Sequence, residues 1–500
     1  MTTYIIKRVL LMIPTLLMIA LIIFLVLNLA PGRPGQTQVS ADGMQSSESA
    51  EARESYRIFK EQFNFDKPIL FNTRFNLTEA DVRSRLDLRV QFNKPVCPDT
   101  GEKPEGCLPV DQKPSSAAVI KAVEEVEDWG AYIVPELVSI AADEKADLLL
   151  RKLAVVNLAS NAQMRLKSQY GRKPTPEERE YNDNAQKENE QLRAWRPSKE
   201  MSAEEFNKLV KENWVPWFEM NKPRFEYSGG DKVAIFFTDT RFAKYMYNLS
   251  KLDFGVSHVD KKPVLDTIGG KLKYSISLSL LSILLAYMIS VPLGVWSAYR
   301  QGSRADQTVT LILFMLYSLP SFFIAVVVLE LFTWGEPFKW FPTGGFGDAG
   351  ADTMTTLEQL KSIAWHLVLP LLCMTYRGLA SLSRYARTGV LDVIRADYIR
   401  TARAKGLGEP MVVIKHAVRN GMIPILTLLG SLLPVLIGGS VIIEVIFNIP
   451  GMGLYLFESI LARDYNAIMA VLLISSLLTL VGLLVSDLSY AVVDPRISFD

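Results

Sequence analysis

Apolar runs long enough to cross a lipid bilayer constrain this 500-residue chain more than any other feature of its sequence. A bilayer core of about 30 Å needs about 20 apolar residues in a helix, because no water is available there to satisfy an unfolded backbone. Runs of this kind lie at approximately 9–29, 274–299, 308–334, 366–389, 422–444 and 468–492. The sequence therefore predicts an all-α membrane protein with six transmembrane helices.

The first apolar run could also be read as a secretory signal peptide. Its length of about 20 residues exceeds the apolar core of a signal peptide. The residues that follow, Asn28-Leu29-Ala30-Pro31, offer no good cleavage site. We therefore expect a retained first helix within residues 1–35, followed by a region of soluble character at 36–273 and a transmembrane core at 274–500.

The basic residues of the short loops predict the orientation of these helices, because Lys and Arg in such loops prefer the cytoplasm. Those on one side are Lys7, Arg8, Arg300, Arg304, Arg384, Arg387, Arg395, Arg400, Arg403, Lys405, Lys415, Arg419 and Arg496. The opposite short loops hold Lys339, Lys361 and Arg463. We expect both termini to be cytoplasmic and the region 36–273 to be extracytoplasmic.

The cysteines fit this orientation. Cys373 lies within an apolar run and is expected to be a small buried hydrophobe. Cys97 and Cys107 bracket a Pro- and Gly-rich stretch, CPDTGEKPEGC, on the side predicted to be oxidising. A disulfide between them and two free thiols remain equally open.

Several kinds of site are disfavoured by the sequence. The net charge of +1 gives no reason to expect a nucleic-acid partner. His258, His366 and His416 are far apart and divided between the two predicted sides of the membrane, so we expect no metal site. No GxxxxGK[ST] string occurs, so we do not expect the chain itself to supply the usual ATP site.

Ionisable residues within predicted spans are costly and carry a functional hypothesis by default. Glu330 and Glu444 fall near outer ends, where a carboxylate can reach water. Arg377 either faces protein or water, or lies where its helix has already left the bilayer, and we favour the second interpretation. Asp487 either lies at a solvated helix end, pairs with Arg496 or has a role in transport.

Glu444 has neighbours that give it further weight. Gly438-Gly439 precede it, and Pro450-Gly451-Met452-Gly453 follow it. These residues allow tight turns and broken helix, which a membrane tolerates only beside protein or water. Glu444, Pro450, Gly451 and Gly453 are therefore candidate residues of an outer mouth.

The loop at 390–421 is unusual for a simple connector. Leu391, Ile394, Tyr398 and Ala402 recur at helical spacing and predict a short amphipathic helix over about 391–405. Gly406 suits a left-handed helix stop, and Glu409-Pro410 suits the first turn of a second helix. On periodicity alone, a hairpin that rests on anionic lipid explains the pattern equally well.

The full string VLDVIRADYIRTARAKGLGEPMVVIKHAVRNGMIP at 390–424 resembles the coupling loop, or EAA loop, of binding-protein-dependent ABC importers in its peptide-permease form. Gly406 matches the central glycine, and Arg400-Thr401-Ala402 stand where the general pattern has Glu-Ala-Ala. In that family the first loop helix fits a groove on the ATP-binding subunit. The residues that the resemblance assigns to this contact are Asp397, Tyr398, Arg400, Thr401, Ala402, Ala404 and Gly406.

Other segments resemble the same family in the same order. They are the first span ending in Ala-Pro-Gly, FNFDKP at 63–68, YMYNLSKLDFGVS at 245–257, VPLGVWSAYRQGSRAD at 291–306, GGSVIIEVIFNIPGMGLYLFESILARDY at 438–465 and VSDLSYAVVDPRI at 485–497. Roughly 77–240 is left unmatched as an insert, and in the family the segment after span five lines the outer mouth.

The insert carries signals for soluble helices. Thr175-Pro176-Glu177-Glu178 and Ser202-Ala203-Glu204-Glu205 have the form of helix starts, the second a capping box. Residues 129–163 read as a helical hairpin. The insert is either a solvated cap over the outer face or a platform for a substrate-binding protein.

The resemblance implies the first-permease (B-type) subunit of a dipeptide/oligopeptide importer in a bacterial inner membrane, with the type I permease fold. Its expected partners are a second homologous permease, two ATP-binding subunits that hold ATP and Mg, an extracytoplasmic binding protein and the lipid bilayer. Related permeases carry nickel chelates or sugars, so the solute stays open. A membrane-anchored receptor without transport and a secondary transporter are the rival classes.

Overall fold

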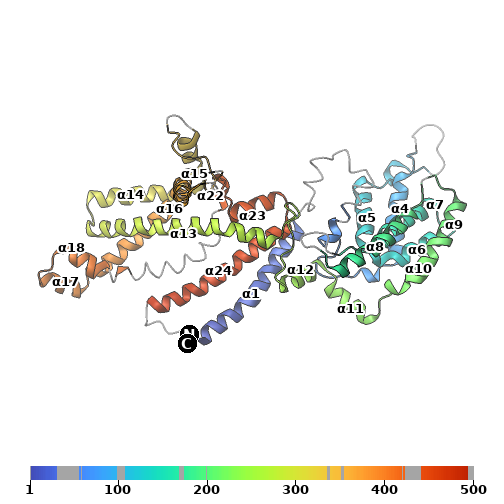
Figure 1. Cartoon of the computed structure of the whole chain (residues 1–500), viewed down its shortest axis with the longest axis horizontal. Helices are drawn as coiled ribbons and strands as arrows, with labels where there is room; N and C mark the ends of the chain where they lie inside the picture. The colour runs from blue at the N-terminus through green and yellow to red at the C-terminus, as the bar shows by residue number, and fades with distance from the viewer. Residues whose placement is uncertain are drawn as a thin grey trace. The chain divides into compact units, whose positions relative to one another are not determined.

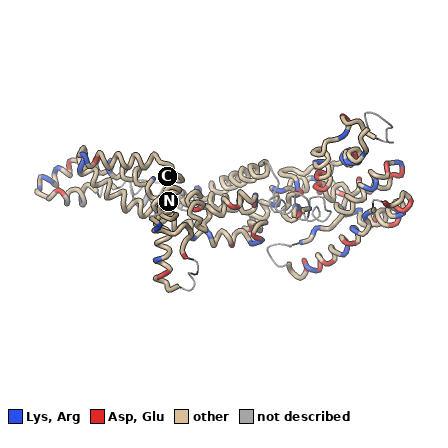
Figure 2. Tube along the Cα trace, turned by 90° about the horizontal axis from the view of Figure 1, so that it is seen from above, with Lys and Arg blue, Asp and Glu red and all other residues tan. Residues whose placement is uncertain are grey.

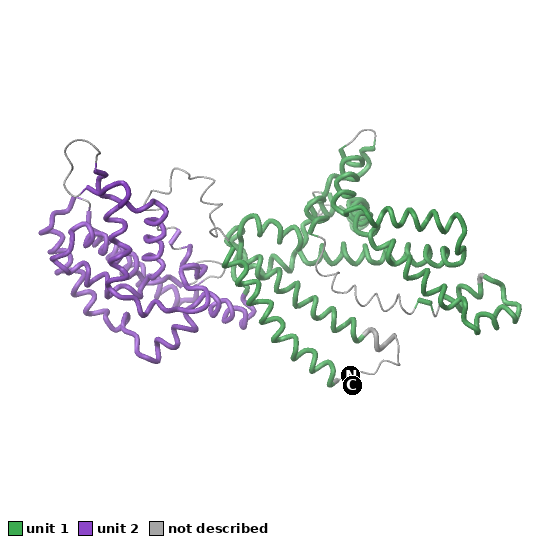
Figure 3. The backbone as a smooth tube through the Cα atoms, turned by 180° about the vertical axis from the view of Figure 1, so that it is seen from behind, with its two compact units in different colours: residues 1–37, 254–500 green, residues 38–253 purple. Residues whose placement is uncertain are grey.

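The computed structural model of the chain describes residues 2–30, 56–57, 59–97, 107–167, 174–198, 200–334, 338–348, 350, 354–418, 421–422 and 441–493. Within these ranges the regular structure is helical, with isolated β-bridges and no longer strand. The chain divides into two compact units, which Figure 3 colours separately. Unit 1 comprises residues 1–37 and 254–500, and unit 2 comprises residues 38–253.

Unit 1 holds the long apolar helices (Figure 1). Its α-helices are α1 (Thr2–Leu29), α13 (Val264–Tyr299), α14 (Arg304–Ser318), α15 (Ser321–Leu329), α16 (Thr356–Ile394), α17 (Asp397–Ala404), α18 (Glu409–Met411), α22 (Val441–Ile446), α23 (Met452–Leu461) and α24 (Tyr465–Val493). Its π-helical segments are η6 (Glu330–Trp334) and η8 (Val412–Val418). Figure 2 shows that charged residues concentrate around α17 and α18 and are sparse along the middle of the long helices.

Four helices of unit 1, namely α1, α13, α16 and α24, are long and apolar enough to cross a membrane. They contain the first, second, fourth and sixth predicted spans. Helix α16 has 39 residues, or about 58 Å at about 1.5 Å per residue, so it is longer than a bilayer core. Arg377 on α16 is exposed, as is Glu330 at the start of η6.

The third predicted span, 308–334, is bent in the structure. Helix α14 meets the segment formed by α15 and η6 at an angle of 93°, with Leu319 and Pro320 between them, and the two parts together are long and apolar enough for one broken span or a re-entrant loop. Proline disfavours helical geometry in the preceding residue, and Leu319 is extended with φ −82° and ψ 132°. Most of the fifth predicted span, 422–444, lies outside the described residues, so the count of six spans stays a prediction.

Small residues on one face of α13 allow α16 to pack closely against it. They are Ser275, Ser279, Ser282, Ala286, Ser290, Gly294 and Ser297, all of them buried. A Cβ atom at Gly294 would lie 2.5 Å from the Cβ of Ala386 and 2.5 Å from the carbonyl oxygen of Ser383. The hydroxyl of Ser383 donates a hydrogen bond of 3.2 Å to the carbonyl of Ser290. Close backbone approach of this kind is how helices associate where lipid removes the hydrophobic driving force.

Helices α1 and α24 lie side by side (Figure 1) and are joined near the two chain ends. The Asp487 carboxylate accepts hydrogen bonds from the Tyr4 hydroxyl at 2.8 Å and from Arg8 Nη2 at 3.0 Å. One interpretation of the sequence was that Asp487 forms a structural pair. The structure confirms a pair, but its partners are Tyr4 and Arg8 of α1. Its proposed partner Arg496 lies outside the described residues.

Unit 2 is a helical domain with its own core. Its α-helices are α4 (Glu79–Asn93), α5 (Ser116–Trp129), α6 (Val134–Ala142), α7 (Leu148–Asn161), α8 (Pro176–Ala194), α9 (Ala203–Leu209), α10 (Val215–Asn221), α11 (Gly229–Thr238) and α12 (Arg241–Ser250). Short 3₁₀ turns at Arg74–Asn76, Val110–Gln112, Gly130–Ile133 and Lys222–Arg224 and a π-helical turn at Val210–Trp214 connect them. Fully buried Phe206 and Trp214 pack with aliphatic residues of α4, α6 and α7.

The helix signals of the insert are confirmed in unit 2. Thr175 and Ser202 each accept a hydrogen bond from the backbone of the third following residue, and both helix starts are capping boxes. The hairpin predicted over 129–163 is formed by α6 and α7, while Trp129 ends α5.

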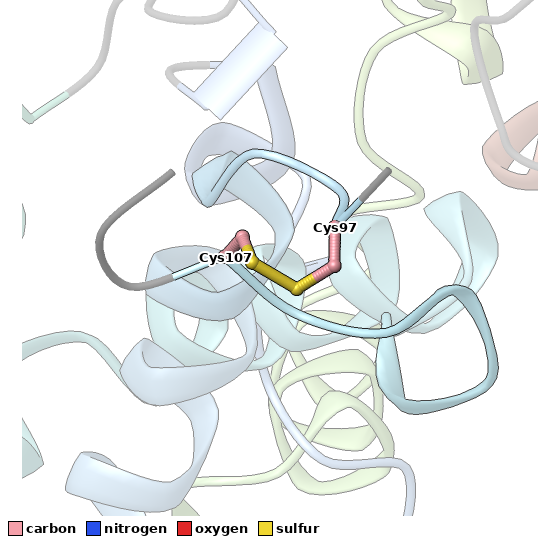
Figure 4. Close-up of a disulfide and its surroundings, with 2 residues drawn as sticks. All are labelled: Cys97 and Cys107. Carbon is pink, nitrogen blue, oxygen red and sulfur yellow. A yellow bond between two sulfur atoms is a disulfide. The ribbon is translucent and has the colours of Figure 1, made fainter. Parts of the chain in front are cut away.

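Cys97 and Cys107 form a disulfide in the structure (Figure 4). The backbone N–H of Cys97 donates to the carbonyl of Leu108 at 2.9 Å, and the N–H of Leu108 donates to Pro95 at 2.9 Å. These bonds align the two short segments that carry the cysteines. Of the two states that the sequence left open, the structure has the disulfide, and Cys373 is buried as predicted.

A largely buried polar cluster joins the two ends of unit 2. The Asp239 carboxylate accepts hydrogen bonds from Lys67 Nζ at 2.8 Å, the Tyr132 hydroxyl at 2.7 Å and the Asn72 amide at 3.2 Å. Burial would raise the pKa of Asp239, but the charge of Lys67 and the hydrogen bonds from Lys67 and Tyr132 outweigh it and hold this pKa below its usual value. Lys67 lies in the FNFDKP segment, so this cluster ties that segment to the insert.

Replacing Asp239 with Asn should destabilise unit 2 by about 3 kcal/mol, because Lys67 is left without its counter-charge in a site where it is 14% exposed. Hydrogen exchange of the detergent-solubilised chain measures the effect as faster exchange in 67–76 and 229–244. The control is Glu144→Gln, which breaks an ion pair with Lys211 whose side chains are 54% and 70% exposed and should change stability by less than about 1 kcal/mol. Equal effects of the two substitutions would show that the buried cluster has no special role.

Candidate functional site

The loop at 390–421 is helical, but its first helix is shorter than predicted. A single helix over about 391–405 is wrong, because α16 runs on to Ile394 and α17 begins only at Asp397. Between them Ala396 is extended, with φ −69° and ψ 149°. Gly406 has φ +76° and so ends α17 in the left-handed conformation, as predicted. The second helix starts at Glu409-Pro410, also as predicted, and continues through η8.

One face of α17 is fixed to the rest of unit 1. Ile399 is fully buried and Ala402 is 8% exposed. They pack in one cluster with Ala298 of α13, Val390 of α16 and Val412 and Ala417 of η8. Ala402 therefore packs α17 against the core of this chain. The resemblance had instead assigned Ala402 to the contact with a partner subunit.

The opposite face of α17 and the turn after it are exposed and hold the other six predicted contact residues. The side chain of Asp397 is 96% exposed and that of Arg400 is 74% exposed. The exposed residues are Asp397, Tyr398, Arg400, Thr401, Ala404 and Gly406. In the turn and the helical segments that follow α17, apolar Leu407, Met411 and Ile414 are also exposed, at 41%, 52% and 68%. This mixed surface is suited to contact with another protein.

An ion pair that sequence reasoning missed closes the turn at Gly406. Arg403 Nη2 and Nε donate to the two Glu409 oxygens at 2.6 and 3.1 Å. The hydrogen bond from Arg403 is the main cause that lowers the pKa of Glu409 below its usual value. The sequence signal that could have predicted this pair is two opposite charges six residues apart across a glycine turn. The bidentate geometry holds α17 against the start of α18.

Two glycines place the end of the loop against α16. A Cβ atom at Gly389 would lie 2.2 Å from the carbonyl oxygen of Gly421, and one at Gly421 would lie 2.8 Å from the oxygen of Gly389. Only glycine permits such close contact between the two backbones. Sequence reasoning missed both residues, because nothing in the sequence pairs positions so far apart.

The candidate residues of the outer mouth form a second cluster in unit 1. Glu444 is fully buried, so the expectation that its carboxylate reaches water is wrong for this structure. Its Oε1 accepts from the Ser275 hydroxyl at 2.8 Å, and its Oε2 accepts from the backbone N–H of Gly453 at 2.6 Å and of Leu454 at 3.1 Å. We call Ser275, Glu444 and residues 451–454 the Glu444 network.

The Glu444 network caps the start of α23. The first N–H groups of a helix have no partner within it and favour a negative charge. Here the Ser275 oxygen accepts from Met452 at 2.8 Å, and Glu444 accepts from the next two N–H groups. A carboxylate on α22 and a hydroxyl on α13 thus hold α23 in place.

The glycines around this cap are required by space. A Cβ atom at Gly451 would lie 2.4 Å from Glu444 Oε2 and 2.5 Å from Ser275 Oγ. One at Gly453 would lie 2.7 Å from the Cα of Val441. Pro450 precedes this turn and is partly buried, whereas Gly438-Gly439 lie outside the described residues. The predicted residues Glu444, Gly451 and Gly453 therefore meet in one place.

Gly451→Ala should destabilise the protein by about 1–3 kcal/mol, because the added methyl group overlaps two hydrogen-bonding oxygens. Thermal unfolding of the purified protein in detergent measures this loss. Gly269→Ala on α13 is the matched control, since a Cβ atom there meets nothing within 4 Å. Alanine is the better helix former, so the control should be neutral or slightly more stable. An unchanged melting temperature for Gly451→Ala would contradict the steric role of this glycine.

Comparison with known proteins identifies the family of unit 1. Residues 290–499 match the family model described as the binding-protein-dependent transport system inner membrane component. This matched range includes the 390–421 loop and the candidate residues of the outer mouth.

Curated relatives extend the similarity. The oligopeptide transport system permease protein of Bacillus subtilis (strain 168) is 40% identical over 260 residues, which cover 52% of this chain and 80% of that protein. The dipeptide transport system permease protein of Alkalihalophilus pseudofirmus is 33% identical over 273 residues, covering 52% and 81%. The peptidoglycan transport system permease protein of Agrobacterium fabrum is 36% identical over 283 residues, covering 56% and 77%. The chain therefore belongs to the inner-membrane permease subunits of binding-protein-dependent ABC importers.

Proposed function

We propose that this chain forms half of the translocation pathway of an ATP-driven importer for peptides that an extracytoplasmic binding protein delivers. The observation that carries the proposal is the exposed face of α17, which ends at Gly406 in a chain of this family. The complex contains a second homologous permease and two ATP-binding subunits, which hold ATP and Mg. The chain itself supplies the pathway and hydrolyses nothing.

Peptides are the best supported solute. Relatives that cover about half of the chain are named for oligopeptide and dipeptide transport. The relative from Agrobacterium fabrum is named for peptidoglycan transport, whereas none of the three relatives is named for transport of a nickel chelate or for a receptor without transport.

The proposed topology is that of a type I importer permease with six spans in a bacterial inner membrane. Both termini and the 390–421 loop lie in the cytoplasm, and unit 2 is extracytoplasmic. Two observations support this orientation. The basic residues of the short loops gather on one side. The Cys97–Cys107 disulfide belongs to unit 2, and disulfides persist in oxidising compartments.

Coupling to ATP hydrolysis follows from the two faces of α17. Its exposed face lies in a groove of the ATP-binding subunit, while Ile399 and Ala402 attach it to α13 and α16. When the ATP-binding pair closes, α17 moves as a rigid lever and the spans change between inward- and outward-open states. ATP shifts this equilibrium only through its different affinity for the two states.

Reconstitution tests the proposed function directly. Vesicles that contain this chain, its homologous permease, the two ATP-binding subunits and the binding protein from the same gene cluster should take up synthetic di- to pentapeptides when ATP is supplied. Uptake should stop without ATP or without the binding protein. Failure of the chain to co-purify with an ATP-binding subunit, together with no ATP-dependent peptide uptake, would overturn the importer proposal.

Gly406→Val should leave assembly intact and abolish the stimulation of ATP hydrolysis by substrate. A Cβ atom at Gly406 meets nothing within 4 Å, so the substitution acts through the backbone. A β-branched residue is strained at φ +76°, which reorients α17 relative to α18. Gly408→Val is the control, because Gly408 is equally open but has φ −61°. Normal stimulation in the Gly406 variant would contradict the role given to the loop.

A further inference from the structure

One buried residue joins the first turn of helix α14 to two neighbouring helices. Of its fifteen residues, all of them described, Asp306 alone is buried, at 3% exposed. The apolar residues farther along α14 are exposed, among them Leu311, Phe314 and Tyr317 at 54%, 61% and 54%. Much of the apolar surface of α14 is therefore exposed within the described chain, and the contacts of Asp306 fix its first turn.

Asp306 is bonded to two other helices and to the turn before its own. Its Oδ1 accepts from the Ser297 hydroxyl of α13. Its Oδ2 accepts from Arg387 Nη2 of α16 at 2.9 Å and from the backbone N–H of Gly302 at 3.0 Å. The carboxylate thus joins α13, α14 and α16 at one point.

This point is adjacent to the seat of α17. Ser297 precedes Ala298, and Arg387 lies one helical turn before Val390. Ala298 and Val390 belong to the cluster that holds Ile399 and Ala402. The residues that bind Asp306 therefore sit on the same two helix ends that carry the coupling loop. When α17 is displaced, packing transmits the movement to α13 and α16, and the Asp306 carboxylate transmits it to α14.

Arg387 has an unused donor that gives this contact a second arrangement. It bonds Asp306 through Nη2, while its Nε is buried with no hydrogen-bond partner among the described residues. Asp306 Oδ1, the oxygen needed for a bidentate pair, is occupied by Ser297. Movement of α14 relative to the closely packed α13 and α16 would break the bond to Ser297 and free this oxygen for Arg387 Nε. The Arg387–Asp306 pair can thus have one hydrogen bond in one state of the protein and two in another. The two-bond pair is the stronger one, so the contact favours one state over the other.

We infer that Asp306 and Arg387 are positioning residues that transmit movement of the coupling loop to α14. The inference rests on the proposed function, because it assumes that α17 is driven by an ATP-binding subunit. Neither residue contacts substrate in this account. Their role is to make α14 move with α13 and α16, so that the pathway opens only when α17 is displaced.

The test is a double-mutant cycle in the assembled complex. Asp306→Asn, Arg387→Met and their combination are reconstituted with the partner subunits, and ATP hydrolysis is measured with and without the binding protein loaded with a synthetic di- to pentapeptide pool. Each single variant should lower the ratio of stimulated to basal hydrolysis by about tenfold, within the range typical of coupling between sites. The double variant should lower it no further, because the residues act through one contact.

Conservative and control variants separate this role from folding. Arg387→Lys keeps the positive charge but loses the two parallel N–H donors of arginine, so it should give an intermediate ratio of stimulated to basal hydrolysis. This variant remains informative if Asp306→Asn fails to assemble. Arg384→Met, an exposed basic residue one turn earlier on α16, should keep the wild-type ratio. Unchanged ratios in the Arg387 variants, additive losses in the cycle, or an equal loss in Arg384→Met would overturn the inference. A wild-type complex without any stimulation would instead refute the proposed function.

Discussion

A helix that starts or breaks within a membrane protein leaves backbone N–H groups that water cannot reach, and unit 1 depends on how this constraint is met. At the start of α23, Ser275 accepts from the first N–H group and the buried Glu444 carboxylate accepts from the next two. A second buried carboxylate, Asp306, fixes the first turn of α14 and accepts from Gly302 in the exposed turn before it. Each carboxylate also binds a serine of α13, Ser275 or Ser297. Helix α13 is therefore the element against which the irregular parts of unit 1 are placed.

Close packing of α13 and α16 turns this arrangement into a mechanical element. The glycine and serines of α13 bring the two helices into backbone contact, and α17 packs on their ends. Interiors packed this closely deform little, so α13, α16 and α17 are expected to move together. Helix α14 differs, because a polar contact rather than hydrophobic packing holds its first turn. A transporter needs both kinds of attachment: rigid elements that transmit movement and weakly packed elements that change position.

Sequence reasoning predicted local features well. The left-handed glycine at 406, the start of the second loop helix at Glu409-Pro410 and the capping boxes of unit 2 depend on backbone preferences of a few neighbouring residues. The long spans α1, α13, α16 and α24 were likewise readable from continuous apolar sequence. The resemblance to peptide permeases rested on the order of several such segments, and the comparisons confirmed the family.

What the sequence could not predict are contacts between distant segments. Asp487 pairs with Arg8 at the other end of the chain, and Glu444 binds Ser275, which lies 169 residues earlier in the sequence. The burial of Glu444 and the inward position of Ala402 follow from such packing, which no periodicity reveals. The break at Ala396 was missed because its residue type is a strong helix former, so tertiary contacts outweigh local propensity there.

Site-specific cross-linking from the exposed face of α17 tests the central claim most directly. Cys97 and Cys107 are joined and Cys373 is buried, so Thr401→Cys provides a single accessible thiol. In membranes containing the whole complex, a short thiol-reactive photo-cross-linker at this position should capture an ATP-binding subunit, while the same probe at Leu461→Cys, on the opposite predicted side, should not. Capture of lipid alone from position 401, with no ATP-binding subunit in the adduct, would contradict the account.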